Sequence, residues 1–144
     1  MPHCDLSAAE QQKRKLLASK TRSEIRSHMK IEEEDETSLF VVYRDYFIQI
    51  TFGDFHPLMV LRLAKSLLQT DTAEQHQMTN DLNLHSVFGC HAVNEEAGCY
   101  SYRTTLWLDT ALSARRFFEI LDRCVDEADR GYLNLAVNSC KIPD

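Results

Sequence analysis

Hydrophobic and polar residues alternate in blocks along the chain, and the first block predicts a helix over residues 7–29. Ser7, followed three residues later by Glu10, matches the capping box that starts a helix, and good helix formers fill the middle. The apolar stripe of this helix is thin and consists of Leu16, Leu17, Ile25 and Met29. We therefore expect a helix with a narrow packing contact, followed by a linker at the acidic run 32–36.

Runs of β-branched and aromatic residues predict strands over 39–43 and 46–52. The two polar residues between them, Arg44 and Asp45, predict a tight hairpin. In the second run, the even-numbered residues from Tyr46 to Phe52 share one face. Residues 58–63 predict a third strand, but the same apolar run also fits the start of a helix that reaches Leu68.

A second helix and a second hairpin are predicted by residues 71–108. Asp71 or Thr72 caps a polar helix over 71–84. Residues 87–94 and 99–108 predict two strands, and the turn between them passes through Gly98.

The closing helix has the strongest helical periodicity. Asp109, Thr110 or Ser113 caps it, and Gly131 frays or ends it near Tyr132. Its apolar face is made up of Ala114, Phe117, Phe118, Leu121, Cys124, Val125, Ala128 and Tyr132. The opposite face carries oppositely charged residues at four-residue spacing, including Arg123 with Glu127.

The order of these elements, α–β–β–β–α–β–β–α, predicts the fold class. Strands joined by short turns, with helices set between the groups, indicate an α+β domain with a mainly antiparallel, five-stranded sheet. We expect a single domain over 1–144, in which 1–36 form an N-terminal helix and acidic linker and 37–138 form the α+β core.

Composition narrows the class of protein. The chain has 144 residues, a net charge of −6 and 44% hydrophobic residues, which is typical of one globular domain. No apolar run approaches the ~20 residues of a membrane span, and the first residues lack the apolar core of a signal peptide. We expect a cytoplasmic protein that does not enter a membrane.

Charge is segregated along the chain. Residues 1–30 hold seven basic and three acidic side chains, and the acidic run 32–36 begins two residues after Lys30. A basic helix can contact nucleic acid, but an adjacent acidic linker can also neutralise its field locally. We favour the second interpretation, because an acidic chain repels a phosphate backbone.

One group of residues has the chemistry of a zinc site, namely His85, Cys90, His91 and Cys99. If Asn94 pairs with Cys99 in the second hairpin, the two thiols lie about four residues, or roughly 13 Å, apart. His91 then points to the face opposite Cys90. We therefore expect no metal site.

No other pattern indicates catalysis. Five cysteines without a CxxC spacing predict reduced thiols, and Cys124 on an apolar stripe predicts an inert core thiol. No phosphate-binding loop and no GxSxG or HExxH motif occurs in the sequence. We expect no enzyme, no catalytic residue and no cofactor.

The strand over 99–108 has two different faces. Tyr100 and Tyr102 share one face, while Arg103 and Trp107 share the other. An aromatic strand with basic residues can bind single-stranded nucleic acid, but this strand has only one basic residue. A tryptophan on a polar strand face is more typical of packing or of a protein interface.

The sequence resembles the type III secretion chaperone-like superfamily and, within it, the bacterial YbjN-like proteins. The resemblance covers roughly residues 37–135. It is carried by the helix end 79–84, the strand Phe88-Gly89-Cys90-His91-Ala92-Val93, the turn through Gly98, the strand Tyr100-Ser101-Tyr102-Arg103 and the helix 117–132.

This resemblance implies a non-enzymatic protein-binding module, namely a homodimeric adaptor or chaperone whose partners are a second copy and an unidentified protein. In secretion chaperones the dimer forms around the middle helix and neighbouring strands. The residues expected to bind a partner or form the dimer are Met78, Leu82, Leu84, Val87 and Trp107. The alternative is a regulator that contacts nucleic acid through the basic N-terminal helix.

Overall fold

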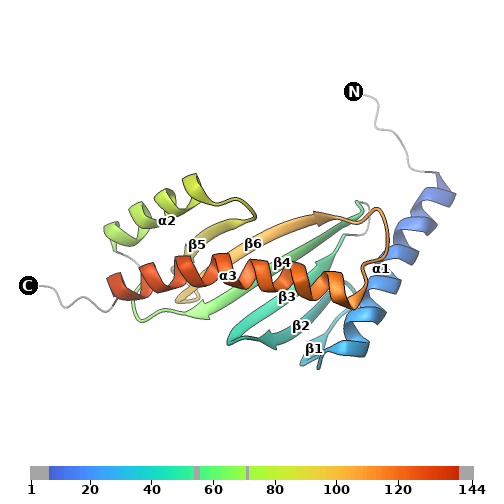
Figure 1. Cartoon of the computed structure of the whole chain (residues 1–144), viewed down its shortest axis with the longest axis horizontal. Helices are drawn as coiled ribbons and strands as arrows, with labels where there is room; N and C mark the ends of the chain where they lie inside the picture. The colour runs from blue at the N-terminus through green and yellow to red at the C-terminus, as the bar shows by residue number, and fades with distance from the viewer. Residues whose placement is uncertain (1–6, 54–55, 71, 140–144) are drawn as a thin grey trace, which may run out of the picture.

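The computed structural model describes residues 7–53, 56–70 and 72–139 (Figure 1). Within these residues the helices are α1 (Ala8–His28), α2 (Ala73–His85) and α3 (Ala114–Ser139). The strands are β1 (Glu33–Glu34), β2 (Ser38–Tyr43), β3 (Tyr46–Phe52), β4 (Leu58–Ser66), β5 (Cys90–Asn94) and β6 (Cys99–Trp107). The α+β class and the helix order predicted from the sequence are confirmed.

The described strands form one sheet in the order β1-β2-β3-β4-β6-β5, and every neighbouring pair is antiparallel. The prediction of five strands is wrong, because part of the acidic run forms the edge strand β1. Arg22 and Arg26 of α1 both contact the Glu34 carboxylate, at 3.2 and 2.6 Å, so they hold the run beside β2. Two residues of the predicted linker, Glu33 and Glu34, are therefore part of the sheet.

The first hairpin has the predicted strands and turn. Arg44 and Asp45 both adopt positive φ angles, 47° and 70°, as in the two-residue turns that match the twist of paired strands. In the adjoining strand β4, the strand interpretation of residues 58–63 is correct and the helical alternative is wrong. The strand pairs with β3 and β6 along its length, which satisfies its backbone groups on both sides.

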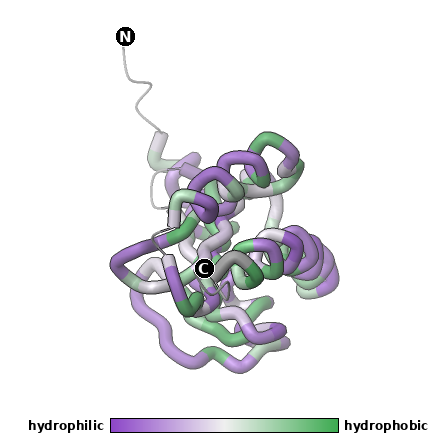
Figure 2. The backbone as a smooth tube through the Cα atoms, turned by 90° about the vertical axis from the view of Figure 1, so that its left-hand side faces the viewer, coloured by the Kyte–Doolittle hydropathy of each residue, from purple (hydrophilic) through white to green (hydrophobic). Residues whose placement is uncertain are grey.

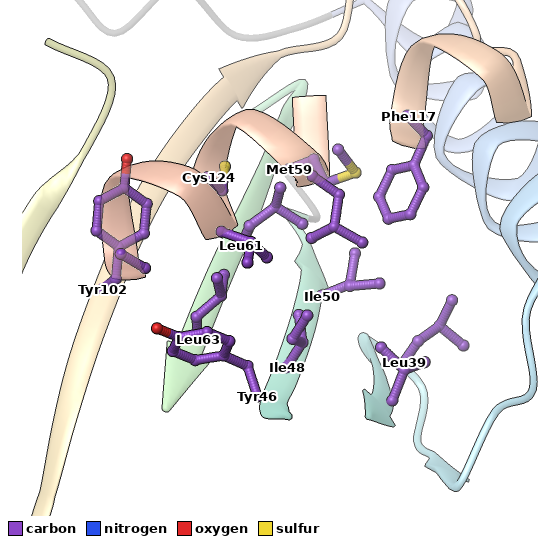
Figure 3. Close-up of a cluster of buried hydrophobic side chains, with 14 of the residues drawn as sticks. Leu39, Tyr46, Ile48, Ile50, Met59, Leu61, Leu63, Tyr102, Phe117 and Cys124 are labelled. Atoms are coloured by element: carbon purple, nitrogen blue, oxygen red, sulfur yellow. The ribbon is translucent and has the colours of Figure 1, made fainter. Parts of the chain in front are cut away.

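One face of the sheet carries the core. Inward-facing residues of β2, β3, β4 and β6 pack against the apolar stripe of α3. Figure 3 shows side chains such as Ile50, Met59 and Leu61 pointing from the strands toward Phe117 and Cys124 of α3. Hydrophobic and hydrophilic residues alternate in short stretches along the backbone, as expected for elements with one buried side (Figure 2).

Helix α3 is longer than predicted and passes through Gly131 without a break. This glycine packs closely against the sheet: a Cβ atom at Gly131 would lie 2.4 Å from Nδ1 of His91 and 3.0 Å from the Tyr100 hydroxyl. The glycine therefore serves close packing between α3 and the sheet. The expectation that Gly131 frays or ends the helix is wrong.

We expect Gly131→Ala to lower the free energy of unfolding by about 1–3 kcal/mol, because its methyl group would overpack the contact with His91. The sign of this change is informative, because a Gly-to-Ala substitution at an exposed helix position raises the free energy of unfolding by about 1 kcal/mol. Urea unfolding would measure the change, with Asn134→Ala on the exposed side of the same helix as the control. A more stable G131A protein would contradict the packing role.

Candidate functional site

The residues predicted to bind a partner do not form one surface. Met78 and Leu82 of α2 are half-buried against the core. Leu84 and Val87 are exposed, at 72% and 94%, where α2 leads into β5. Trp107 is 60% exposed and lies on the opposite face of the sheet from the buried residues of β6.

Two apolar surfaces can therefore be distinguished. We call the first the α2–β5 surface, defined by Leu84, Val87 and the 38% exposed Phe88. We call the second the open face, the side of the sheet that faces away from the core. Strand alternation places on it residues of even number in β2, β4 and β5 and of odd number in β3 and β6, including Phe40, Val42, Phe47, Val60, Arg62, Arg103 and Trp107.

The α2–β5 surface is held in place by Glu127 of α3. The Glu127 carboxylate accepts hydrogen bonds from the backbone amides of Val87, Phe88 and Gly89, at 3.0 to 3.4 Å. It also accepts a 2.8 Å hydrogen bond from the Tyr102 hydroxyl. These bonds replace sheet pairing for residues 87–89, which explains why β5 begins three residues later than predicted.

The position of Glu127 differs from the one that the sequence predicts. The four-residue spacing suggested an ion pair with Arg123 on the outer side of the helix, whereas the carboxylate turns toward β6 and the loop before β5. Burial opposes ionisation of this carboxyl, but the four donors outweigh burial and hold its pKa below the usual value of 4.5. No sequence spacing could reveal donors that lie on another element.

The edge of the sheet at β5 is covered at one position, His91. The Asn83 side chain of α2 accepts a 2.7 Å hydrogen bond from the His91 amide and donates a 2.9 Å hydrogen bond to the His91 carbonyl. Since β6 lies on the other side of β5, these backbone groups point outward from the sheet. Asn83 therefore covers the position at which an added strand would pair.

The second hairpin has the register expected from the sequence, with His91 opposite Tyr102 and Cys90 opposite Arg103. His91 is buried on the core face, where its Nδ1 lies 2.6 Å from the Tyr100 hydroxyl. Burial lowers the pKa of its imidazole, although the charge of Glu127 acts in the opposite direction. The ring is thus a neutral packing element beneath α3.

The predicted zinc-type group is spread over several positions. Cys90 is exposed and Cys99 is half-buried on the open face, while His91 lies on the core face. Among the described residues, no group of three or more His, Cys, Asp or Glu side chains is arranged to hold a metal ion. Burial raises the pKa of the Cys124 thiol to about 12, in agreement with the predicted core position.

The open face is hollowed across its middle. The hollow has a volume of about 680 Å³ and is lined by residues from β1 to β6, among them Glu33, Phe40, Phe47 and Arg62. Strand pairing places Arg62 of β4 directly opposite Arg103 of β6. Arg103 is the one basic residue of its own strand, and the second arginine comes from the neighbouring strand β4.

The basic helix α1 is partly neutralised by the acidic run. In addition to its contact with Glu34, Arg22 donates hydrogen bonds to the backbone carbonyls of Asp35, Glu36 and Ser38. Hydrogen bonds from Arg26 and Arg22 lower the pKa of the Glu34 carboxyl. This arrangement is the local neutralisation that we favoured over nucleic-acid contact. None of the helices in the described ranges has the length and apolar character needed to cross a membrane.

No protein-family model matches the sequence, and the sequence matches no curated protein. Solved structures do share the fold. YbjN from E. coli superposes with a TM-score of 0.62 at 9% identity, covering 87% of this chain and 95% of that chain. The ExsC–ExsE complex gives a TM-score of 0.62 at 12% identity, covering 91% of this chain and 96% of that chain.

A third similar structure is the type III secretion chaperone SycH of Yersinia pestis, solved in complex with a stable fragment of YscM2. It gives a TM-score of 0.55 at 13% identity, covering 79% of this chain and 98% of that chain. These likenesses confirm the fold that the sequence resemblance implied. The chain therefore has the fold of YbjN and of type III secretion chaperones.

We expect Glu127→Gln to lower the free energy of unfolding at neutral pH by about 1.5–3 kcal/mol, because it removes a charged acceptor from four donors. The folded-state pKa of Glu127 is lowered, so its contribution is present above pH 4.5 and is lost as the pH falls below that value. The stability difference between wild type and variant should therefore shrink in acid.

Urea titrations from pH 7 to acid would measure this difference. Glu119→Gln is a suitable control, because Glu119 lies on the same helix and is 63% exposed. Equal stability of E127Q and wild type, or a difference independent of pH, would show that the four hydrogen bonds do not hold the loop.

Proposed function

We propose that the protein is a non-enzymatic, chaperone-like protein-binding module that acts as a homodimeric adaptor in the bacterial cytoplasm. The observation that carries the proposal is the open face, which keeps Val42, Phe47 and Trp107 at least half exposed. Burying such side chains against a partner is favourable, and exposed large apolar side chains on one face are typical of interaction sites. SycH, which shares the fold, has been solved with a bound protein fragment.

The α2–β5 surface is the proposed dimer contact. Leu84 and Val87 lie at the end of α2. Together with Leu68, they are the most exposed large apolar side chains among the residues that the structure describes. Their loop is fixed by Glu127 and Asn83, so little conformational freedom would be lost on association. Met78 and Leu82 support this surface from the core side.

The open face, with Trp107 at one end of β6, is the proposed partner surface. Tryptophan is among the residues that contribute most to protein interfaces, because a large apolar ring can be buried at a low entropic cost. The dimer contact and the partner contact would then use opposite sides of the sheet. One chain in a dimer could thus bind a partner without breaking the dimer.

The internal ionisable groups support a structural role. Tyr46 and Tyr102 donate hydrogen bonds to Asp129 and Glu127, and burial raises the pKa of both phenols. His91 is neutral and buried, as described above. These groups join α3 to the sheet, which is what a rigid binding scaffold requires.

We expect Leu84→Asp combined with Val87→Asp to convert the dimer into a monomer, because two carboxylates would have to be desolvated in the contact. Native mass spectrometry should then change from about twice 16.6 kDa to 16.6 kDa. Leu133→Asp is the matched control, since Leu133 is 63% exposed on α3.

A double variant that still has the dimer mass would remove the α2–β5 surface from the dimer contact. A wild-type chain that is monomeric at every concentration would contradict the homodimer itself. Leu82→Asp is unsuitable for this test, because Leu82 packs on the core and its substitution would destabilise the fold.

A further inference from the structure

We propose that the open face binds an acidic, apolar segment of a partner protein, and that Arg62 and Arg103 receive the carboxylates of that segment. This inference rests on the proposed protein-binding function and adds the chemistry of the partner. It follows from the juxtaposition of two arginines on adjacent strands of an otherwise uncharged part of the sheet.

The two arginines lie in an unfavourable arrangement. Arg62 and Arg103 are direct cross-strand partners, both are exposed, and both side chains lie on the open face. Like charges directly opposite one another destabilise a sheet. Among the residues that the structure describes, neither guanidinium forms a salt bridge or a hydrogen bond. Within the described part of the chain no anionic partner offsets this pair of like charges, so an external anion would relieve it.

Among the described residues, the carboxylates on this side of the sheet stand too far across the strands to neutralise the two arginines. The open-face positions of β2 to β6 include no Asp or Glu. Glu33 of β1 shares the cross-strand row with Arg62, but the row runs through Phe40 and Gln49. Three strand spacings amount to about 14 Å. This separation exceeds the screening length of about 8 Å at physiological salt.

Apolar anchors surround the arginines. Phe47 is 64% exposed and Val42 50% exposed in the row beside Arg62, and Trp107 is 60% exposed farther along β6. The hollow of about 680 Å³ passes over Phe47 and Arg62. Arg62 lines this hollow, and Arg103 is its cross-strand partner on β6. A hollow with apolar side chains and two cations at its side fits a convex segment that combines large apolar side chains with carboxylates.

A second copy of the chain is a poorer occupant. Two hollowed faces placed against one another would leave their centres unfilled. A two-fold axis near the arginine row would also bring four guanidinium groups together, since such an interface is self-complementary. Addition of a strand at the β5 edge is hindered by Asn83, so a partner segment is directed to the face.

A nucleic acid also fits less well than a protein. Glu32 and Glu33 line the hollow at the β1 end, and the chain carries a net charge of −6. Both features repel a continuous phosphate backbone. A protein segment can place its few carboxylates at the arginines and keep them away from Glu33.

Trp107 provides the measurement, because it is the single tryptophan of the chain and lies on the open face. Three short synthetic peptides share the same Leu and Phe anchors and differ only in the residues between the anchors. These residues are Asp and Glu in the acidic peptide, Ser in the second peptide and Lys in the third. We expect the acidic peptide to bind most tightly, with a blue shift of Trp107 emission. Raising the salt concentration should weaken its binding.

Charge reversal tests the arginine pair. Arg103→Glu should weaken binding of the acidic peptide by about tenfold, because one attraction becomes a repulsion. The same substitution should raise the urea midpoint, since it replaces a like-charge cross-strand pair with an opposite pair. Lower affinity together with higher stability cannot result from unfolding. Arg115→Glu, at an exposed position of α3, changes net charge equally and should leave affinity unchanged.

Several outcomes would overturn the inference. Equal affinity for the acidic and serine peptides, or equal effects of R103E and R115E, would mean that the arginines only keep the face soluble. In that case the protein-binding function would stand. If none of the three peptides binds, the protein-binding function of this face fails as well. Tighter binding of a single-stranded oligonucleotide, or a Trp107 shift on self-association alone, would assign the face to nucleic acid or to a second copy.

Discussion

The whole structure depends on the packing of one helix, α3, along one face of the sheet. Its apolar stripe covers the inward side chains of β2, β3, β4 and β6, and it supplies Glu127 and Asp129 to the tyrosines beneath it. Because the helix passes over this face, Gly131 must lie almost in contact with His91. The core, the buried polar groups and the loop before β5 are therefore fixed by a single element. Removal of α3 would leave a sheet with two exposed faces, which is unstable in water.

The same arrangement determines where a partner can bind. Helices occupy the core side, Asn83 and Glu127 occupy backbone groups at the β5 end, and β1 is a short edge with exposed glutamates. Short, charged or covered edges are how soluble proteins prevent unwanted strand pairing. In the described part of the chain, the open face and the α2–β5 surface both keep large apolar side chains exposed. The protein thus restricts edge pairing while keeping apolar side chains exposed, a combination that favours recognition by side chains over recognition by backbone.

Much of the fold could be predicted from the sequence, because local pattern decides local structure. The Arg44–Asp45 turn, the register of Cys90 with Arg103 and the apolar stripe of α3 depend on residues close in sequence. The errors concern contacts between distant residues. The acidic run became a strand through arginines of α1, and Glu127 turned inward through amides nearly forty positions earlier. The pairing of Arg62 with Arg103 could not be predicted from the sequence either, because local pattern does not determine which strand pairs with β4.

The placement of charge gives a final reason to regard the open face as functional. On the core side, two charged groups have close partners: Arg44 lies within 3.3 to 3.8 Å of Asp122, Asp126 and Asp129, and Glu127 has four donors. On the α1 side, Arg22 and Arg26 are matched by Glu34. Arg62 and Arg103 differ from these groups, because two like charges stand on directly paired residues of the sheet. Proteins tolerate local conflicts of this kind mainly at functional sites, where the conflict is resolved by the bound partner.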